Sequence, residues 1–151
     1  MFELRDLYQQ VIVDHNKSPR NFGKLEPFNH EADGYNPLCG DKLHIYLQVS
    51  DEGLIEGVSF EGEGCAISVA SASLMTDAIK GTPVADFEQR FEAFQHMVTS
   101  DLAEEPDLDT LGKLAVLSGV REFPSRIKCA SLCWHTLKSA VEDSHHVAKT
   151  E

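Results

Sequence analysis

The sequence predicts an α+β fold, in which a small antiparallel sheet of about three strands has helices packed on one face. Residues 42–49 alternate apolar and polar side chains, which is the period of a strand with one buried face. Residues 54–60 are rich in β-branched and aromatic side chains and follow the turn sequence Asp51-Glu52-Gly53, so the two runs indicate a hairpin. From Ile67 onward, apolar residues recur at helical spacing. Strands followed by helices favour a sheet that is covered on one face.

One helix and one irregular segment are expected before the hairpin. Apolar residues recur at helical spacing up to Ile12, and the pattern stops at Asn16-Lys17-Ser18-Pro19, which predicts an amphipathic helix at the start of the chain. Residues 19–37 have no clear period and contain several glycines, prolines and asparagines, as a long functional loop often does. After the hairpin, residues 65–68 leave room for a short third strand.

Two helices are expected directly after the hairpin. The first carries an apolar stripe from Ile67 to Ala78 and ends at Gly81, a residue suited to the position that follows a helix. The second restarts at Thr82-Pro83 and has the clearest apolar face in the sequence. That face consists of Val84, Phe87, Phe91, Phe94 and Val98.

Two more helices complete the prediction. A short helix over residues 111–117 is expected to end at Gly119. Ser125 is expected to cap the last helix. The side chains of that helix that should point inward are Ala130, Trp134, Leu137 and Val141. Residues 144–151 read as a flexible tail, and the whole chain, 1–151, reads as a single domain.

Composition limits the classes of partner and compartment. The chain has 151 residues, 42% of them hydrophobic, which suits one domain with a buried core. Its formal net charge of −12 argues against nucleic acid or an anionic membrane as a partner, because both would be repelled. Without an export signal or a membrane-spanning run, we expect the protein in the cytoplasm. In that reducing compartment its four cysteines are better explained as metal ligands or reactive thiols than as disulfides.

Three of the cysteines lie at the ends of predicted elements, where sites are usually assembled. Cys39 precedes the first strand, with Asp41 two residues later, so a thiolate and a carboxylate can converge on one ion. Cys65 follows Gly62-Glu63-Gly64, whose small residues let the backbone approach an ion closely. Cys129 is expected in the first turn of the last helix, where the helix dipole favours a thiolate.

The cysteine spacing leaves alternatives open. Any single cysteine can be a small buried hydrophobic residue, and the chain has no C-x-x-C pair to identify a metal site. Arg126 and Lys128 add positive charge beside Cys129. Cys133 lies one helical turn after Cys129, next to Trp134, which favours core packing over a role as a resolving thiol.

Four blocks of sequence, in order along nearly the whole chain, resemble the IscU/SufU family of iron–sulfur cluster assembly proteins, whose members are NifU N-terminal-like. The blocks are Asp14-His15-x-x-x-Pro19-Arg20-Asn21-Phe22-Gly23, Asn36-Pro37-x-Cys39-Gly40-Asp41, Gly62-x-Gly64-Cys65-Ala66-Ile67-Ser68-x-Ala70-Ser71-Ala72-Ser73 and Arg126-Ile127-Lys128-Cys129-Ala130. The resemblance implies that Cys39, Asp41, Cys65 and Cys129 occupy the metal and cluster positions. Lys128 stands where the IscU branch has histidine, and the IscU chaperone-binding motif is absent, so the chain is more similar to the SufU branch.

Resemblance to the SufU branch implies a zinc-dependent sulfur acceptor for a SufS-like cysteine desulfurase that uses pyridoxal phosphate, with downstream Suf proteins as recipients. Cys39 is then the acceptor thiolate. Arg126 is implied either to contact the metal-site region or the desulfurase, or to be an ordinary charge at a helix start. The alternative is a scaffold that binds iron and builds a transient [2Fe–2S] cluster on the same four ligands. A zinc site that serves only the structure is a third reading, and four protein ligands would leave no position for the water of a metallohydrolase.

Overall fold

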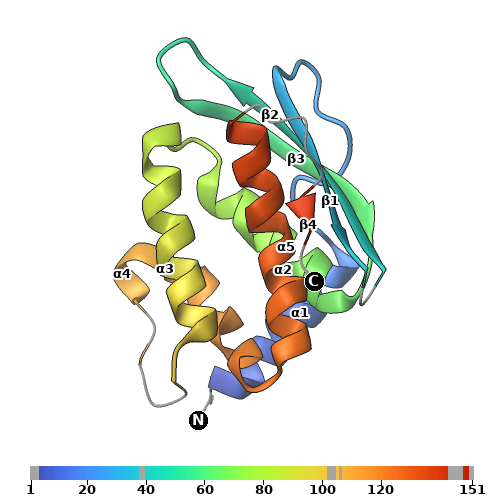
Figure 1. Ribbon diagram of the computed structural model, residues 1–151, viewed down its shortest axis with the longest axis vertical. Helices are drawn as coiled ribbons and strands as arrows, with labels where there is room; N and C mark the ends of the chain where they lie inside the picture. The colour runs from blue at the N-terminus through green and yellow to red at the C-terminus, as the bar shows by residue number, and fades with distance from the viewer. Residues whose placement is uncertain (1–3, 38–39, 102–104, 106, 143–147, 150–151) are drawn as a thin grey trace.

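The sheet carries helices on one face and is largely open on the other (Figure 1). The computed structural model describes residues 4–37, 40–101, 105, 107–142 and 148–149. The elements are α1 (Leu4–Lys17), β1 (His30–Asn36), β2 (Asp41–Val49), β3 (Ile55–Glu63), α2 (Ala66–Ile79), the 3-10 helix η1 (Val84–Asp86), α3 (Phe87–Thr99), α4 (Leu108–Leu111), the 3-10 helix η2 (Gly112–Glu122), α5 (Pro124–Val141) and β4 (Ala148–Lys149). This confirms the predicted α+β fold class.

The strands are ordered β3-β2-β1-β4. β2 pairs antiparallel with both β1 and β3, and β4 adds a parallel pairing at Gly34 and Tyr35. The predicted hairpin is confirmed as β2 and β3, whose turn contains Gly53 with a φ of +86°. Leu43, Ile45 and Leu47 of β2 are buried under the helices, as the alternating pattern predicts.

β1 is a strand that the sequence prediction missed, because residues 19–37 read as one irregular segment. Its helix-facing positions are small rather than bulky: Ala32 is buried, and a side chain at Gly34 would overlap Thr136 of α5. Its other face carries the exposed residues Glu31 and Asp33. The close passage of α5 therefore removes the large apolar residues by which a strand is recognised.

The helices form two layers behind the sheet (Figure 1). α5 packs on β1 and β2, α2 packs on α5 and β3, and α3 lies behind α5 with η2. Trp134 of α5 is fully buried and stacks on Phe94 of α3, with ring centroids 4.8 Å apart. The apolar face predicted for α3 is buried at Phe87, Phe91, Phe94 and Val98. None of the helices in the described part of the chain is long and apolar enough to cross a membrane.

Four local predictions differ from the structure. Residues 65–68 form no strand, because α2 begins at Ala66. The short helix predicted to end at Gly119 continues as η2 to Glu122. Ser125 does not cap α5, which begins at Pro124 with Phe123 as its N-cap. Within the segment predicted to be a tail, the described residues Ala148–Lys149 pair with β1.

The Asp14-to-Asn21 block ties the end of α1 to α2. His15 Nδ1 lies 2.7 Å from Ser73 Oγ, and the backbone N–H of Arg20 donates to the same hydroxyl at 2.8 Å. Asn21 Nδ2 donates to Thr76 Oγ1 at 3.2 Å. These contacts fix the end of α1 and the residues after it against the second half of α2, the helix whose N-cap is Cys65.

Candidate metal centre

Three of the four predicted ligands come together where β2, α2 and α5 meet. Asp41 is the first residue of β2, Cys65 is the N-cap of α2, and Cys129 lies in α5. One oxygen of Asp41 and the two sulfur atoms all lie within 4.8 Å of one another. Asp41 is fully buried, Cys129 is 2% exposed, and Cys65 is partly exposed. Cys39, the fourth predicted ligand, lies outside the described residues.

Glycine is required at position 64 because the Asp41 carboxylate occupies the space of a side chain there. A Cβ on Gly64 would overlap Asp41 Oδ1. The same oxygen accepts the backbone N–H of Cys65 at 2.8 Å. The Gly62-Glu63-Gly64 sequence was expected to let the backbone approach an ion. In the structure, Gly64 lets it approach the Asp41 carboxylate, a candidate ligand.

The electrostatic environment favours the thiolate of Cys65. A hydrogen bond with Cys129 is the largest influence, and it lowers the pKa of Cys65 to about 7 even though burial opposes the charge. Backbone N–H groups of Ser68 and Ile67 at the start of α2 lower it further, while the charge of Asp41 raises it. The helix-start effect was predicted for Cys129, but that residue lies beyond the first turn of α5. The helix that favours a thiolate is therefore α2.

Asn36 is a member of the site that the sequence prediction missed. It is the last residue of β1, is fully buried and pairs with Asp41 across the sheet. Its side-chain Nδ2 lies 3.4 Å from Asp41 Oδ2 and 3.6 Å from Cys129 Sγ. The sequence shows Asn36 only as part of a turn-forming block, and its contact with Asp41 depends on a strand that lacks the usual apolar pattern.

The donor set suits zinc or iron. Zinc binds thiolate sulfur at about 2.3 Å and carboxylate oxygen at about 2.0–2.2 Å, usually with four ligands in a tetrahedron. Ligand atoms in such a site are roughly 3.5 Å apart, so the described donors, all within 4.8 Å, need only a small contraction to close on one ion. Soft thiolates favour zinc or iron over calcium or magnesium.

A groove leads from the surface to the two thiols. It has a volume of about 580 Å³ and is lined by α1 and by the starts of α2 and α5. Its wall on α1 includes Ile12 and Val13, and Val13 is 53% exposed. Arg126 also lines the groove and lies over the Phe123 ring at 4.1 Å. Lys128, partly exposed in α5, directly precedes Cys129.

Cys133 stands apart from this site. It is fully buried beside Ser71, whose hydroxyl lies 3.4 Å from its sulfur. Burial raises the pKa of the Cys133 thiol to about 12, so the group stays protonated at neutral pH. Its position agrees with the predicted role in core packing.

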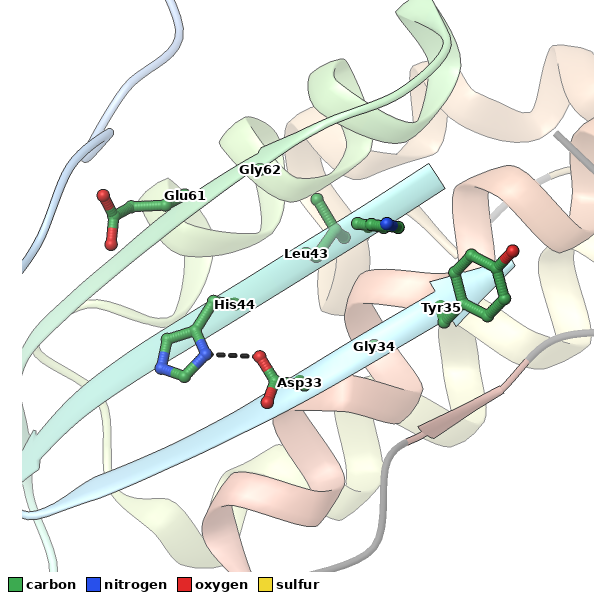
Figure 2. Close-up of a pocket in the computed structure, with 8 residues that line it drawn as sticks. Asp33, Gly34, Tyr35, Leu43, His44, Glu61 and Gly62 are labelled. Carbon is green, nitrogen blue, oxygen red and sulfur yellow. Dashed lines mark hydrogen bonds and ion pairs between the residues drawn. The ribbon is translucent and has the colours of Figure 1, made fainter. Parts of the chain in front are cut away.

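The outer face of the sheet holds a second group of chemically active side chains (Figure 2). A depression of about 650 Å³ is lined by residues of all three long strands, among them Asp33, His44 and Glu61. His44 Nδ1 lies 2.5 Å from Asp33 Oδ1, and its Nε2 lies 2.9 Å from Glu31 Oε2. The two carboxylates therefore bind opposite sides of one ring, and these donors do not converge on a single ion.

Comparisons with known proteins show which protein family this chain resembles. The family model described as NifU-like N terminal domain matches residues 7–146. The chain is 44% identical over 138 residues to the zinc-dependent sulfurtransferase SufU of Bacillus subtilis (strain 168), which covers 91% of each chain. It is 39% identical over 142 residues to the iron–sulfur cluster assembly scaffold protein IscU of Streptococcus pyogenes serotype M1, which covers 94% of this chain and 87% of that one.

A solved structure matches the fold as well. The crystal structure of a protein of Fervidobacterium islandicum AW-1, described as an iron–sulfur cluster assembly scaffold protein for the SUF system, superposes with a TM-score of 0.79. That protein is 32% identical to this chain, and the match covers 87% of this chain and 94% of the other.

Proposed function

Because the chain belongs to the NifU-like N-terminal domain family, we propose that it accepts sulfur from a cysteine desulfurase and delivers it to iron–sulfur cluster assembly. Zinc is held by Cys39, Asp41, Cys65 and Cys129. The observation that carries the proposal is the convergence of the Asp41, Cys65 and Cys129 donor atoms within 4.8 Å of one another. The partner is a SufS-like enzyme that uses pyridoxal phosphate, and the recipients are downstream Suf proteins.

Different residues of the described part of the chain have different roles in the proposed site. Bound zinc would supply a positive charge that keeps its sulfur ligands in the thiolate form. Asp41 holds the start of α2 through the Cys65 N–H, so the carboxylate ligand also sets where Cys65 lies. The groove along α1 gives a partner segment access to the thiols, with Arg126 beside them as a positive charge for an acidic group of that partner.

Cys39 is the proposed sulfur acceptor. Its thiolate attacks the terminal sulfur of the desulfurase persulfide, so that a new S–S bond forms on Cys39 and the S–S bond of the donor breaks. The electron pair leaves with the donor cysteine as a thiolate, and the proton stays on the transferred sulfur. A reducing compartment such as the cytoplasm suits this chemistry, because the acceptor sulfur must stay a reduced thiolate until it meets the persulfide.

Trapping the transferred sulfur tests the proposal. The protein is incubated with a cysteine desulfurase and cysteine, blocked with an alkylating reagent and analysed by mass spectrometry. We expect a persulfide on the chain and faster turnover by the desulfurase, and Cys39→Ala should lose both. Cys133→Ala is the matched control, because it removes a buried thiol outside the site. Undiminished stimulation by Cys39→Ala would contradict the role of Cys39.

A second candidate function is supported by the similarity to the IscU scaffold protein of S. pyogenes. The same donor set can bind iron, so the chain can also hold a [2Fe–2S] cluster while it is assembled. Anaerobic reconstitution with iron and sulfide separates the two functions. A stable chromophore that can be transferred to an apo-ferredoxin favours the scaffold, whereas a colourless protein that retains zinc favours the sulfur acceptor.

A further inference from the structure

Asn36 connects ligands that come from different parts of the fold. It ends β1, while Asp41 begins β2 and Cys129 lies in α5. Its Nδ2 is within 3.4 Å of Asp41 Oδ2 and 3.6 Å of Cys129 Sγ, so one amide nitrogen, which carries two hydrogens, serves both ligands. The residue is fully buried, and its side chain is therefore directed into the site rather than toward water.

We propose that Asn36 is a positioning residue, which holds Asp41 and Cys129 in their metal-binding orientations and reduces the electron density on the Cys129 thiolate. The proposal rests on the metal centre of the proposed function. It assigns Asn36 a role outside the ligand set, as a hydrogen-bond donor to two ligands.

The chemistry of the two ligands fixes the orientation of the amide. A carboxylate and a thiolate are both acceptors, so the amide oxygen of Asn36 would be repelled in the place where its nitrogen lies. The nitrogen is therefore the atom that faces Asp41 and Cys129. An aspartate of the same shape would put a second carboxylate there, and a leucine would leave both ligands without this donor.

Because the Asp41 carboxylate is buried, its contact with the Asn36 amide is important. A fully buried carboxylate is costly unless its oxygens accept hydrogen bonds. Oδ1 accepts the backbone N–H of Cys65 at 2.8 Å, and Oδ2 faces Asn36 Nδ2 at 3.4 Å. Each oxygen thus has an N–H donor that holds the carboxylate in place. Hydrogen-bond partners of metal ligands typically change metal affinity about 10–100-fold when they are removed.

The contact between the Asn36 amide and the sulfur of Cys129 predicts a spectroscopic effect. An N–H donor stabilises the lone pairs of a coordinated sulfur, and this raises the energy needed to transfer an electron from sulfur to the metal. Loss of the donor should therefore shift the thiolate-to-metal charge-transfer band to lower energy. A residue that only filled space would not move this band.

The experiment compares the wild-type protein with Asn36→Leu, which has a similar volume and no donor. Reduced, metal-free protein is titrated with cobalt(II) to record the charge-transfer band, and zinc affinity is measured by competition with a chromophoric chelator. We expect about 10–100-fold weaker zinc binding and a band at lower energy. Asn36→Ala gives the same comparison with less steric demand, so a failure of Asn36→Leu to fold does not leave the question open.

Asn29 provides the matched control. It is an exposed asparagine whose side chain donates to Val49 O at 2.7 Å and accepts the Val49 N–H at 2.9 Å, outside the metal centre. Asn29→Leu removes these two hydrogen bonds and should leave both readouts unchanged. An unchanged affinity or an unshifted band in the Asn36 variants would overturn the role of Asn36. A wild-type protein without a thiolate band would contradict the proposed metal centre itself.

Discussion

Titratable side chains lie in contact on both sides of the sheet, but only on one side do their donor atoms converge. On the helix-covered side, Asp41, Cys65 and Cys129 direct their ligand atoms to one point. On the open side, Glu31 and Asp33 contact opposite nitrogens of the His44 ring. Titratable groups in contact are therefore not sufficient for a metal site, which also requires that their donor atoms converge.

The difference follows from where each group is anchored. The three candidate ligands belong to three different elements that meet at this point, so each approaches from a different direction. The groups on the open face project side by side from β1 and β2, and neighbouring strands present their side chains roughly in parallel. In that arrangement the groups can pair with one another but cannot surround an ion.

Substitution of a ligand should produce the largest difference between the two faces. We expect Cys129→Ser to weaken zinc binding by more than the roughly 10–100-fold typical of changes outside a ligand set, because a neutral hydroxyl is a poor replacement for a thiolate. His44→Gln, on the open face, should bind zinc as the wild type does. Chelator competition measures both affinities, and equal loss in the two variants would contradict the assignment of the site.

Removal of the metal should have the next largest effect. Zinc at about 100 times its Kd would stabilise the fold by about 2.7 kcal/mol. In a chain of this length that corresponds to an increase of roughly 5–10 °C in Tm, measured by differential scanning calorimetry with and without chelator. His44→Gln should keep this increase, whereas Cys65→Ser should lose it. An increase that persists in Cys65→Ser would place the stabilising ion elsewhere.

The contribution of His15, a buried histidine on the helix side, to the stability of the fold should be lost in acid. Burial lowers the pKa of His15, and the charge of Arg20 lowers it further. The neutral ring is therefore the stable form, and its contribution to folding is present above the ordinary pKa of about 6.5 and lost as the pH falls. We expect His15→Gln to cost about 1 kcal/mol at pH 7.5, from the contact with Ser73, and less at pH 5. Urea unfolding at both pH values tests this, and an equal cost at both would contradict it.

The contribution of His44, on the open face, to stability should have the opposite pH dependence to that of His15. It should also be the smallest of these effects. Burial opposes its charge, but hydrogen bonds with Asp33 and Glu31 outweigh this and raise the pKa of His44. Its contribution is therefore complete below a pH of about 6.5 and is lost as the pH rises through the raised pKa. Both carboxylates are largely exposed, so His44→Gln should cost less than about 1 kcal/mol at pH 5.5 and nothing at pH 9. A greater cost at pH 9, by urea unfolding, would reverse this interpretation.

Sequence patterns predicted the elements whose burial follows a regular period. β2 alternates, β3 is rich in β-branched and aromatic residues after a turn, and α3 buries one stripe of phenylalanine side chains, so these elements could be predicted from the chain. β1 could not, because the close passage of α5 leaves only small residues, Ala32 and Gly34, at the centre of its covered face, with the polar residues His30 and Asn36 at the ends. Periodicity reports bulky buried residues, and a strand packed this closely has few.

The same limit applies to the site. Cys65 and Cys129 could be proposed because thiols at the ends of elements suggest chemistry, and Asp41 because it follows Cys39 by two residues, where both side chains can reach one ion. The resemblance of the four sequence blocks to a known family then implied the full set. Asn36 could not, because its contact with Asp41 depends on the register of β1. A buried amide has no signature of its own in a sequence, and only the paired strands show which ligands it reaches.

Zinc K-edge X-ray absorption of the purified protein tests the central claim most directly. We expect a coordination shell dominated by sulfur at about 2.3 Å, from Cys39, Cys65 and Cys129, with one oxygen from Asp41 at about 2.0–2.2 Å. Cys65→Ser should reduce the sulfur contribution, and His44→Gln should leave the shell unchanged. A shell of oxygen and nitrogen without sulfur would contradict the assignment of this site as the metal centre.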